Sequence, residues 1–176
     1  KGKDYNFEQL ATMELSAPAF RSFINPDDAC FANPTSMLDA INDYCLKSGQ
    51  VLPEDDAQVA RLIMESLALR YRSVFGWLKE LASFPLEKLH IIGGGAKNSL
   101  LAQWTANSLG VPVLTGPTEA TAIGNIMMQM KAIGKVNDIH EMRSLISRAV
   151  SLKMYMPEDV ELWDEAYRKY KNYCEK

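Results

Sequence analysis

Apolar residues recur at helical spacing over most of the chain. The longest run without a helix-breaking residue extends from Ala57 to Gly76 or beyond, and its apolar positions lie mostly three and four residues apart. Pro53 and three acidic residues precede this run, and both residue types are favoured in the first turn of a helix. The pattern therefore predicts one long helix in the middle of the sequence, with Pro53 in its first turn.

Shorter segments with the same spacing predict further helices on either side. Several of them begin at polar pairs that resemble capping boxes or end at a glycine. They run from Phe7 to about Leu15 after Asn6 and Gln9, from Ser36 and Asp39 to about Lys47, from Leu100 to Leu109 before Gly110, from Ala120 to Met130 before Gly134, and from Asp138 and Glu141 to about Ala149. Residues 16–34, which three prolines interrupt, are expected to form an ordered loop.

A last amphipathic helix is expected to begin at Pro157. Its aromatic residues recur at helical spacing and form a stripe, which we expect to pack on the body of the domain. These residues are Trp163, Tyr167, Tyr170 and Tyr173.

The helix expected from Ala120 to Met130 is rich in small and flexible residues. Thr118 is the expected N-cap. Gly124 lies in the helix interior, where glycine costs about 1 kcal/mol relative to alanine, so we expect another helix or a ligand to approach closely there. The three methionines of this helix are expected to fill gaps in a core rather than to line a cofactor site. They are Met127, Met128 and Met130.

Glu65 stands among apolar residues in the middle of the long helix. One interpretation is a polar contact with a ligand or a loop. The other places Glu65 on the solvated face of the helix, where it pairs with Arg61 or Arg72. We favour the second interpretation.

Two short apolar runs, Leu89–Ile92 and Val111–Thr115, predict buried strands. A helix joins them within about 25 residues, which predicts a parallel βαβ unit with a right-handed crossover. Two parallel strands do not form a stable sheet by themselves. We therefore expect preceding sequence to supply neighbouring strands, and the alternative is that helices cover both open edges.

Composition indicates one globular domain, 1-176, since 47% of the 176 residues are hydrophobic and 23% are charged. The predicted helices and two strands place it in the helix-rich α/β class. A net charge of -3 without a basic block argues against nucleic acid or an anionic membrane as a partner. No apolar run reaches the ~18 residues of a transmembrane helix. Three widely spaced cysteines without a C-x-x-C motif are typical of the reducing cytoplasm, and two histidines argue against a structural zinc site.

The three glycines Gly93–Gly95 directly follow the first strand, and a helix start at Asn98 and Ser99 follows them. Glycine tolerates positive φ and lets the backbone approach a ligand closely. A helix N-terminus presents free N–H groups and a positive dipole end to the same place. The pattern favours a phosphate- or nucleotide-binding loop, with a plain strand-to-helix turn as the alternative. It matches neither the Rossmann fingerprint nor the P-loop.

Three motifs in this region resemble the C-terminal nucleotide-binding domain of the FGGY carbohydrate kinases. They are Ile92–Ser99 with Gln103 beyond it, Leu109–Val113, and Glu119–Asn125. Upstream segments resemble one branch of that family, the rhamnulokinases. They are Phe23–Asp28, Asn33-Pro34, Tyr44-Cys45 and Gly49-Gln50. The likeness covers about Lys1 to Lys153.

The resemblance implies an actin-like ATPase fold with two ribonuclease-H-like domains that close on a sugar and Mg-ATP. It assigns the adenosine part of ATP to Gly94, Gly95, Ala96 and Asn98, and it makes Gly93 the turn that ends the strand. For Asn98 the alternative role is an N-cap. Glu119 and Thr121 start a helix beside the loop, and their roles are either nucleotide-related or structural.

The resemblance also implies what the chain lacks. The sugar-binding residues, the phosphate loop and the catalytic aspartate of the family lie upstream, so we assign no catalytic residue and no metal ligand here. The chain begins without an initiator Met, and we expect a C-terminal fragment of a two-domain kinase that is inactive alone.

The expected reaction of the intact enzyme converts L-rhamnulose to L-rhamnulose 1-phosphate. The alternatives are a related kinase acting on xylulose, fuculose, gluconate or glycerol, and a non-catalytic helical module that binds a partner protein.

Overall fold

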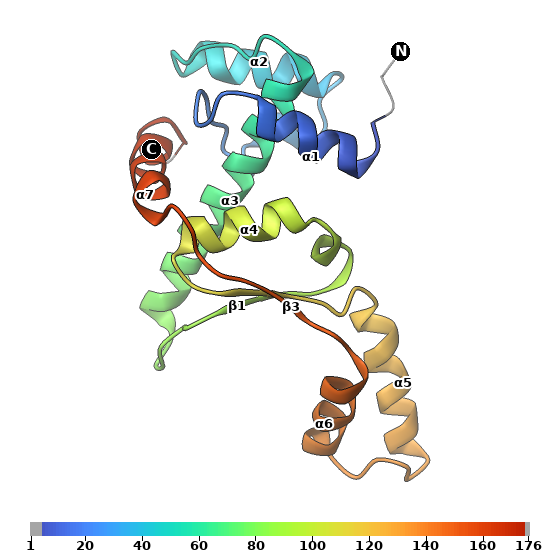
Figure 1. Ribbon diagram of the computed structural model, residues 1–176. Coiled ribbons are helices and arrows are strands. Elements are labelled where there is room, and N and C mark those ends of the chain that lie inside the picture. The colour runs from blue at the N-terminus through green and yellow to red at the C-terminus, as the bar shows by residue number, and fades with distance from the viewer. Residues whose placement is uncertain (1–4, 175–176) are drawn as a thin grey trace.

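The computed structural model describes residues 5–174, apart from the side chains of Phe7 and Glu8. Helices dominate, and three short strands form one sheet (Figure 1). The helices are α1 (Phe7–Ser16), α2 (Met37–Lys47), α3 (Asp56–Leu81), α4 (Ser99–Leu109), α5 (Ala120–Ala132), α6 (Ile139–Ala149) and α7 (Val160–Cys174), with 3-10 turns η1 (Ala29–Phe31) and η2 (Gly93–Lys97). The strands are β1 (Leu89–Ile91), β2 (Val113–Thr115) and β3 (Lys153–Tyr155).

The sheet has the order β1-β2-β3, with β2 in the centre. β1 and β2 are parallel, with Leu89 opposite Val113, so the predicted βαβ unit through α4 is confirmed. β3 runs antiparallel to β2 and places Tyr155 opposite Val113. The sequence analysis missed β3, and the expectation that neighbouring strands come from preceding sequence is wrong for this edge of β2. A later segment of the same chain pairs there instead.

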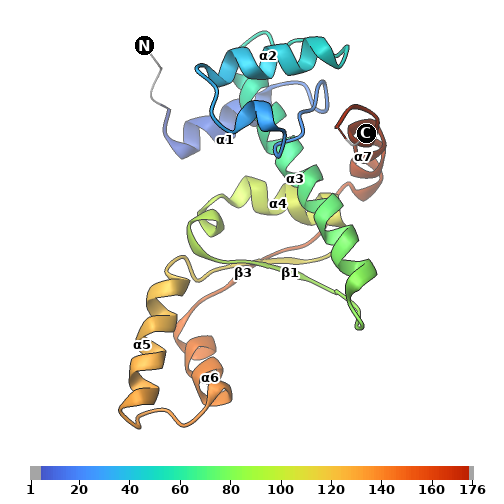
Figure 2. The same cartoon turned by 180° about the vertical axis from the view of Figure 1, so that it is seen from behind.

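The helices lie on both sides of the sheet. In Figure 1 α4 lies directly above the sheet and α3 runs past α4, whereas α5 and α6 extend below as a separate pair. The view from behind in Figure 2 shows the same arrangement. Ala102 and Ala106 of α4 pack against Val113 of β2, and all three are fully buried. These contacts fix the start of α4 relative to the ends of β1 and β2.

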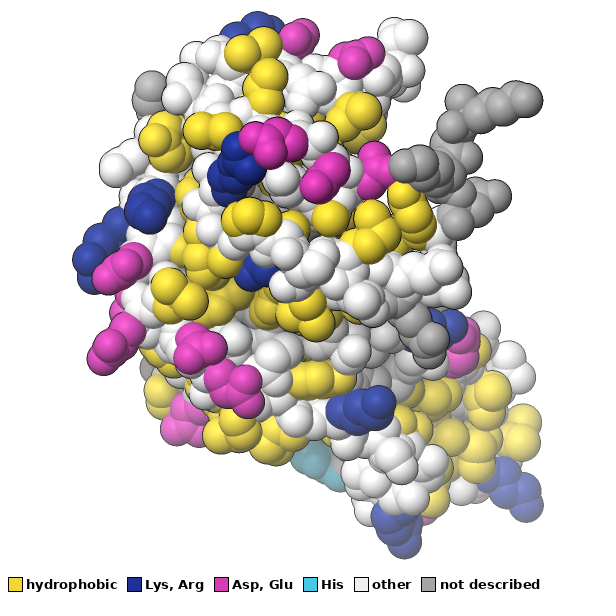
Figure 3. All heavy atoms as spheres, turned by 45° about the horizontal axis from the view of Figure 1, so that its top comes forward, with side chains coloured by type: hydrophobic (Ala, Val, Ile, Leu, Met, Phe, Trp, Pro, Cys, Tyr) yellow, Lys and Arg dark blue, Asp and Glu magenta, His cyan; other side chains and the backbone are white. Residues whose placement is uncertain are grey.

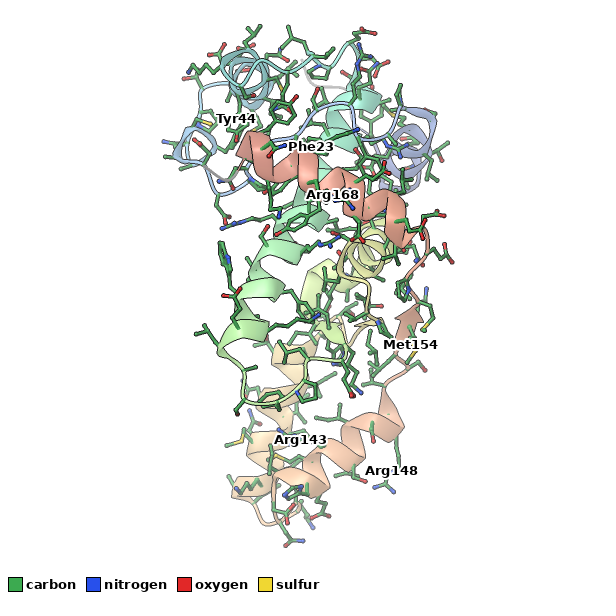
Figure 4. The ribbon with its side chains drawn as sticks, turned by 90° about the vertical axis from the view of Figure 1, so that its left-hand side faces the viewer. Phe23, Tyr44, Arg143, Arg148, Met154 and Arg168 are labelled. Atoms are coloured by element: carbon green, nitrogen blue, oxygen red, sulfur yellow. The ribbon has the colours of Figure 1, made fainter. Side chains whose placement is uncertain are left out.

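The largest core joins segments that lie far apart in the sequence. It contains Phe23, Leu69, Trp104, Trp163 and Tyr170. The rings of Phe23 and Tyr170 meet edge to face with centroids 6.1 Å apart, and Figure 4 shows Phe23 beside α7. Packing of the aromatic stripe is therefore confirmed at Trp163 and Tyr170. Tyr173 is exposed.

Most predicted helix starts are confirmed. Asn6 and Gln9 form a reciprocal capping box, and the Ser36 and Asp138 side chains each accept a hydrogen bond from the third residue of their helix. Three of these predictions were wrong. The long helix begins after Asp55, whose side chain accepts from the Gln58 N–H, so Pro53 lies before it. Likewise α7 begins at Val160 and not at Pro157.

The third wrong prediction concerns α5. Glu119 and not Thr118 is its N-cap residue, and the Glu119 side chain makes no cap hydrogen bond. α5 also has no buried residue, so its three methionines do not fill a core. A Cβ added to Gly124 would meet nothing within 4 Å, and the expected close approach is therefore not made by the described residues.

Figure 3 shows apolar side chains gathered over α5 and α6, and Ile126, Met128, Ile133 and Ile139 are exposed there. Even so, no helix within residues 5–174 is long and apolar enough to cross a membrane.

Glu65 pairs with Arg61 as expected, but it does so inside the protein. The carboxylate lies 2.6 Å from Arg61 Nε and accepts a hydrogen bond of 2.8 Å from the Phe20 N–H. Only 1% of Glu65 is exposed, so its placement on a solvated face was wrong. Burial raises the pKa of Glu65, and the contact with Arg61 opposes this shift. The pair fixes the loop after α1 against α3.

Candidate nucleotide-binding site

The carboxyl ends of β1 and β2 are joined by main-chain hydrogen bonds. Gly93 N–H donates to Pro117 O, and Gly116 N–H donates to Ile91 O, each at 2.9 Å. Gly93 has φ +75°, a conformation that glycine adopts without strain. Gly93 therefore is the turn that ends β1, as the sequence indicated. The loop beyond it forms the turn η2 and leads into α4.

Gly94 and Gly95 are exposed and do not have positive φ. A Cβ at Gly94 would meet nothing within 4 Å, and a Cβ at Gly95 would make an ordinary contact of 3.7 Å with Ile91 Cγ2. The described part of the chain therefore does not require glycine at either position. Positive φ explains only Gly93 in this loop. At Gly94 and Gly95 the missing side chains leave the main chain open to a ligand.

Asn98 makes the contacts of an N-cap residue. Its Oδ1 accepts a hydrogen bond of 2.9 Å from the Leu101 N–H at the start of α4. Its Nδ2 lies 3.7 Å from the sulfur of Met64 on α3, a weak contact. The acceptor side of the amide is thus used within the chain, and the donor side faces Met64 and leaves capacity for a stronger acceptor.

Two cavities border the loop. One of about 200 Å³ lies between α1, α3 and the start of α4, and its lining residues are Leu10, Ala11, Glu14, Met64, Lys97, Asn98 and Ser99. The other, of about 560 Å³, extends over the carboxyl ends of β1 and β2, and its lining includes Ala96, Lys97, Ser99, Thr115 to Thr118 and Lys153. Of the predicted site residues, Asn98 thus lines the first cavity and Ala96 the second. Gly94, Gly95, Glu119 and Thr121 line neither, and all four are exposed.

The sequence analysis missed the residues that α1 and α3 contribute to the smaller cavity, among them an acid, Glu14. This residue is 3% exposed, and burial raises its pKa to about 7 although the charge of Arg61 acts in the opposite direction. The signal was present in the sequence, because Glu14 follows Leu10 by four residues and Ala11 by three. That spacing puts the carboxylate on the apolar face of α1.

A family model of the C-terminal domain of the FGGY carbohydrate kinases matches residues 1–133. The chain belongs to this family. The match includes the glycine loop, α4 and all of α5.

Curated relatives are similar to this chain over nearly its whole length. A rhamnulokinase from Bacteroides thetaiotaomicron is 52% identical over 169 residues, which cover 96% of this chain and 35% of the relative. A rhamnulokinase from Pectobacterium atrosepticum is 44% identical and one from Bacillus subtilis is 39% identical; the matches cover 88% and 90% of this chain and 32% and 33% of these relatives. The chain thus spans about a third of the length of these relatives.

Solved structures of FGGY kinases share the fold. A gluconate kinase from Lactobacillus acidophilus aligns with a TM-score of 0.62 at 18% identity, over 93% of this chain and 33% of that one. A xylulose kinase from Rhodospirillum rubrum aligns with a TM-score of 0.60 at 20% identity, over 93% of this chain and 32% of that one. The helix-rich α/β fold predicted from the sequence is the actin-like, ribonuclease-H-like fold of this family.

Proposed function

We propose that the protein containing this chain is an ATP-dependent rhamnulokinase, and that the chain is its C-terminal nucleotide-binding part. The reaction transfers the γ-phosphoryl group of Mg-ATP to a primary hydroxyl of L-rhamnulose and yields L-rhamnulose 1-phosphate. The observation that carries this proposal is the 52% identity to a rhamnulokinase over nearly the whole chain. It favours rhamnulose over gluconate or xylulose, because the aligned gluconate and xylulose kinases are only 18% and 20% identical. Fuculose and glycerol stay as alternatives.

In this proposal the loop after β1 holds the adenosine part of ATP. Gly94 and Gly95 let the ligand approach the main chain, Ala96 lies in the larger cavity, and Asn98 supplies a donor from its Nδ2. The N-terminus of α4 favours negative charge nearby. These residues suit a nucleoside better than a triphosphate, since among the described residues only Lys97 and Lys153 bring positive charge to the cavities beside the loop, and the smaller cavity has Lys97 alone.

The remaining parts of the site belong to the rest of the protein. Phosphoryl transfer needs positioning and charge stabilisation, and Mg²⁺ supplies part of that stabilisation when it is bound to the phosphates. The sugar site and the aspartate that accepts the hydroxyl proton are upstream in this proposal, so this chain alone does not phosphorylate the sugar. A cytoplasmic location suits Cys30, Cys45 and Cys174, which form no disulfide within the part of the chain that the structure describes.

A thermal-shift titration with Mg-ADP and Mg-GDP tests the nucleotide site. Asn98→Asp keeps an oxygen to cap α4 and removes the amide donor, whereas Asn98→Ala removes both and costs about 1 kcal/mol through the lost cap. We expect ADP to stabilise the wild type by about 2.7 kcal/mol at a hundred times its Kd. The stabilisation by ADP should be smaller in Asn98→Asp.

If ADP does not stabilise this chain, the same titration on the full-length protein distinguishes two explanations. If only the full-length protein responds to ADP, the site needs the remaining chain. If neither responds, the proposal fails and the non-catalytic module is favoured.

A further inference from the structure

Glu14 is a buried acid without a partner for its side chain. Within residues 5–174 the structure gives its carboxylate no hydrogen bond and no ion pair, although it is 3% exposed. Arg61 lies near, but its hydrogen bonds go to Glu65 and to main-chain carbonyls, including that of Glu14 itself. The Glu14 oxygens are not among the fully buried side-chain atoms that lack a partner in the described residues, so they remain accessible. Since Glu14 lines the smaller cavity, a ligand in that cavity can donate to its carboxylate.

The smaller cavity combines apolar walls with a polar edge. Leu10 and Ala11 of α1 and Met64 of α3 provide the apolar walls, and methionine sulfur makes favourable contacts with aromatic rings. Glu14 offers acceptors and the Nδ2 of Asn98 offers a donor in the same cavity. Apolar walls with one acceptor and one donor suit a flat heteroaromatic ring better than a sugar, whose hydroxyl groups point in several directions.

We infer that Glu14 accepts a hydrogen bond from the exocyclic amino group of adenine and so selects adenine over guanine nucleotides. The inference rests on the proposed adenosine site. Adenine carries an amino donor next to the N7 acceptor, whereas guanine carries the O6 acceptor at the corresponding position. Guanine would place that oxygen against the Glu14 carboxylate, with no proton between two acceptors. Asn98 then donates to a ring nitrogen of adenine, which gives its Nδ2 a stronger acceptor than Met64 sulfur.

Three nucleotides separate contacts to the base from contacts to the sugar. Inosine diphosphate carries an oxygen in place of the adenine amino group, and 2′-deoxy-ADP keeps the base but lacks one ribose hydroxyl. Binding is measured by calorimetry with ADP and these two analogues on the full-length protein in Mg²⁺. The measurement is made at pH 8, because the Glu14 pKa of about 7 leaves the carboxylate charged there.

Wild-type protein should prefer ADP over inosine diphosphate by about tenfold to a hundredfold, the usual range for one hydrogen bond to a charged group. Glu14→Gln keeps the size of the side chain, and its amide can donate to the inosine oxygen. We therefore expect it to lower the ADP affinity about tenfold and to abolish the preference. Glu87→Gln, at an exposed position before β1, is the matched control and should change neither.

The outcomes show separately whether the inference fails and whether the proposed function fails. An unchanged preference in Glu14→Gln overturns the inference and leaves the adenosine site intact. A change only in the ratio of ADP to 2′-deoxy-ADP assigns the carboxylate to the ribose and also overturns it. If wild-type protein binds no adenine nucleotide, the proposed function fails and the inference fails with it. A wild-type preference below about threefold overturns the inference even if the variant does not fold.

Discussion

Two buried glutamates near Arg61 differ in what their neighbours provide. Glu65 has the Arg61 guanidinium at 2.6 Å and a main-chain N–H at 2.8 Å. Glu14 feels the charge of Arg61 but receives no hydrogen bond from the described residues. The hydrogen bonds make Glu65 part of the structure that holds the loop after α1. At Glu14 the carboxylate keeps acceptor capacity that the described residues do not use, and this capacity is what the proposed contact with adenine requires.

Glu14 should make the stability of the chain fall as the pH rises. Its pKa is about 7 in the folded chain against 4.5 for an ordinary glutamate, so between these values the folded state holds a proton that the unfolded state has released. Stability is then greatest below pH 4.5, declines up to pH 7 and is level above it. The full decline corresponds to about 3 kcal/mol. Glu14→Gln should remove this decline in urea unfolding at pH 5, 6, 7 and 8.

The exposed variant Glu87→Gln serves as the control and should follow the wild-type curve. If the free energy of unfolding depends on pH in the same way for the wild type and Glu14→Gln, the pKa of Glu14 is not raised in the folded chain. Other carboxylates contribute equally to all three proteins and cancel in the comparison.

At the scale of elements, local signals predicted the helices better than the strands. Asn6, Ser36 and Asp138 mark helix starts because one side chain can satisfy a free N–H within its own turn. β3 has no comparable signal, since Lys153 and Met154 are both exposed and its pairing with β2 depends on distant residues. The glycine loop could be found from sequence, and the spacing of Glu14 from Leu10 and Ala11 indicates the apolar face of α1, but the extent to which Glu14 and Glu65 are buried could not. Their burial depends on how α1 and α3 pack.

Gly124→Ala tests whether α5 is as open as the structure shows. A Cβ there meets nothing within 4 Å, so alanine should stabilise the helix by about 1 kcal/mol. α5 has no buried residue, and we expect it to open locally without unfolding the core. Hydrogen exchange of the α5 amides should slow about fivefold, and the α3 amides should not change.

Ala122→Gly is the reverse change at another exposed position of α5 and should speed exchange by a similar factor. Faster exchange in Gly124→Ala would mean that the added methyl group meets a neighbour, as the sequence suggested for this glycine. Repeating Gly124→Ala in the full-length protein would then show whether the remaining chain approaches α5.

At the scale of the whole molecule, the last helix completes the main core. The family model ends at residue 133, yet Trp163 and Tyr170 of α7 lie beyond it and are 3% and 0% exposed. Trp163 packs against Phe20 of the loop after α1, with ring centroids 4.9 Å apart, and against Trp104 of α4 at 6.1 Å. One side chain thus connects three segments. Because Asn98 caps α4, the packing of α7 against α4 also supports the helix that follows the candidate site.

Trp163→Ala should therefore destabilise the whole chain and not only α7. Removal of a buried tryptophan side chain costs about 3–5 kcal/mol, a large share of the stability of an ordinary domain. Urea unfolding measures this loss, and hydrogen exchange should show that α3, α4 and α7 lose protection together. Leu162→Ala changes the neighbouring residue of the same helix, which is 49% exposed, and should stay within about 0.5 kcal/mol of the wild type. If Trp163→Ala speeds hydrogen exchange only at the α7 amides, the rest of the core folds independently of α7.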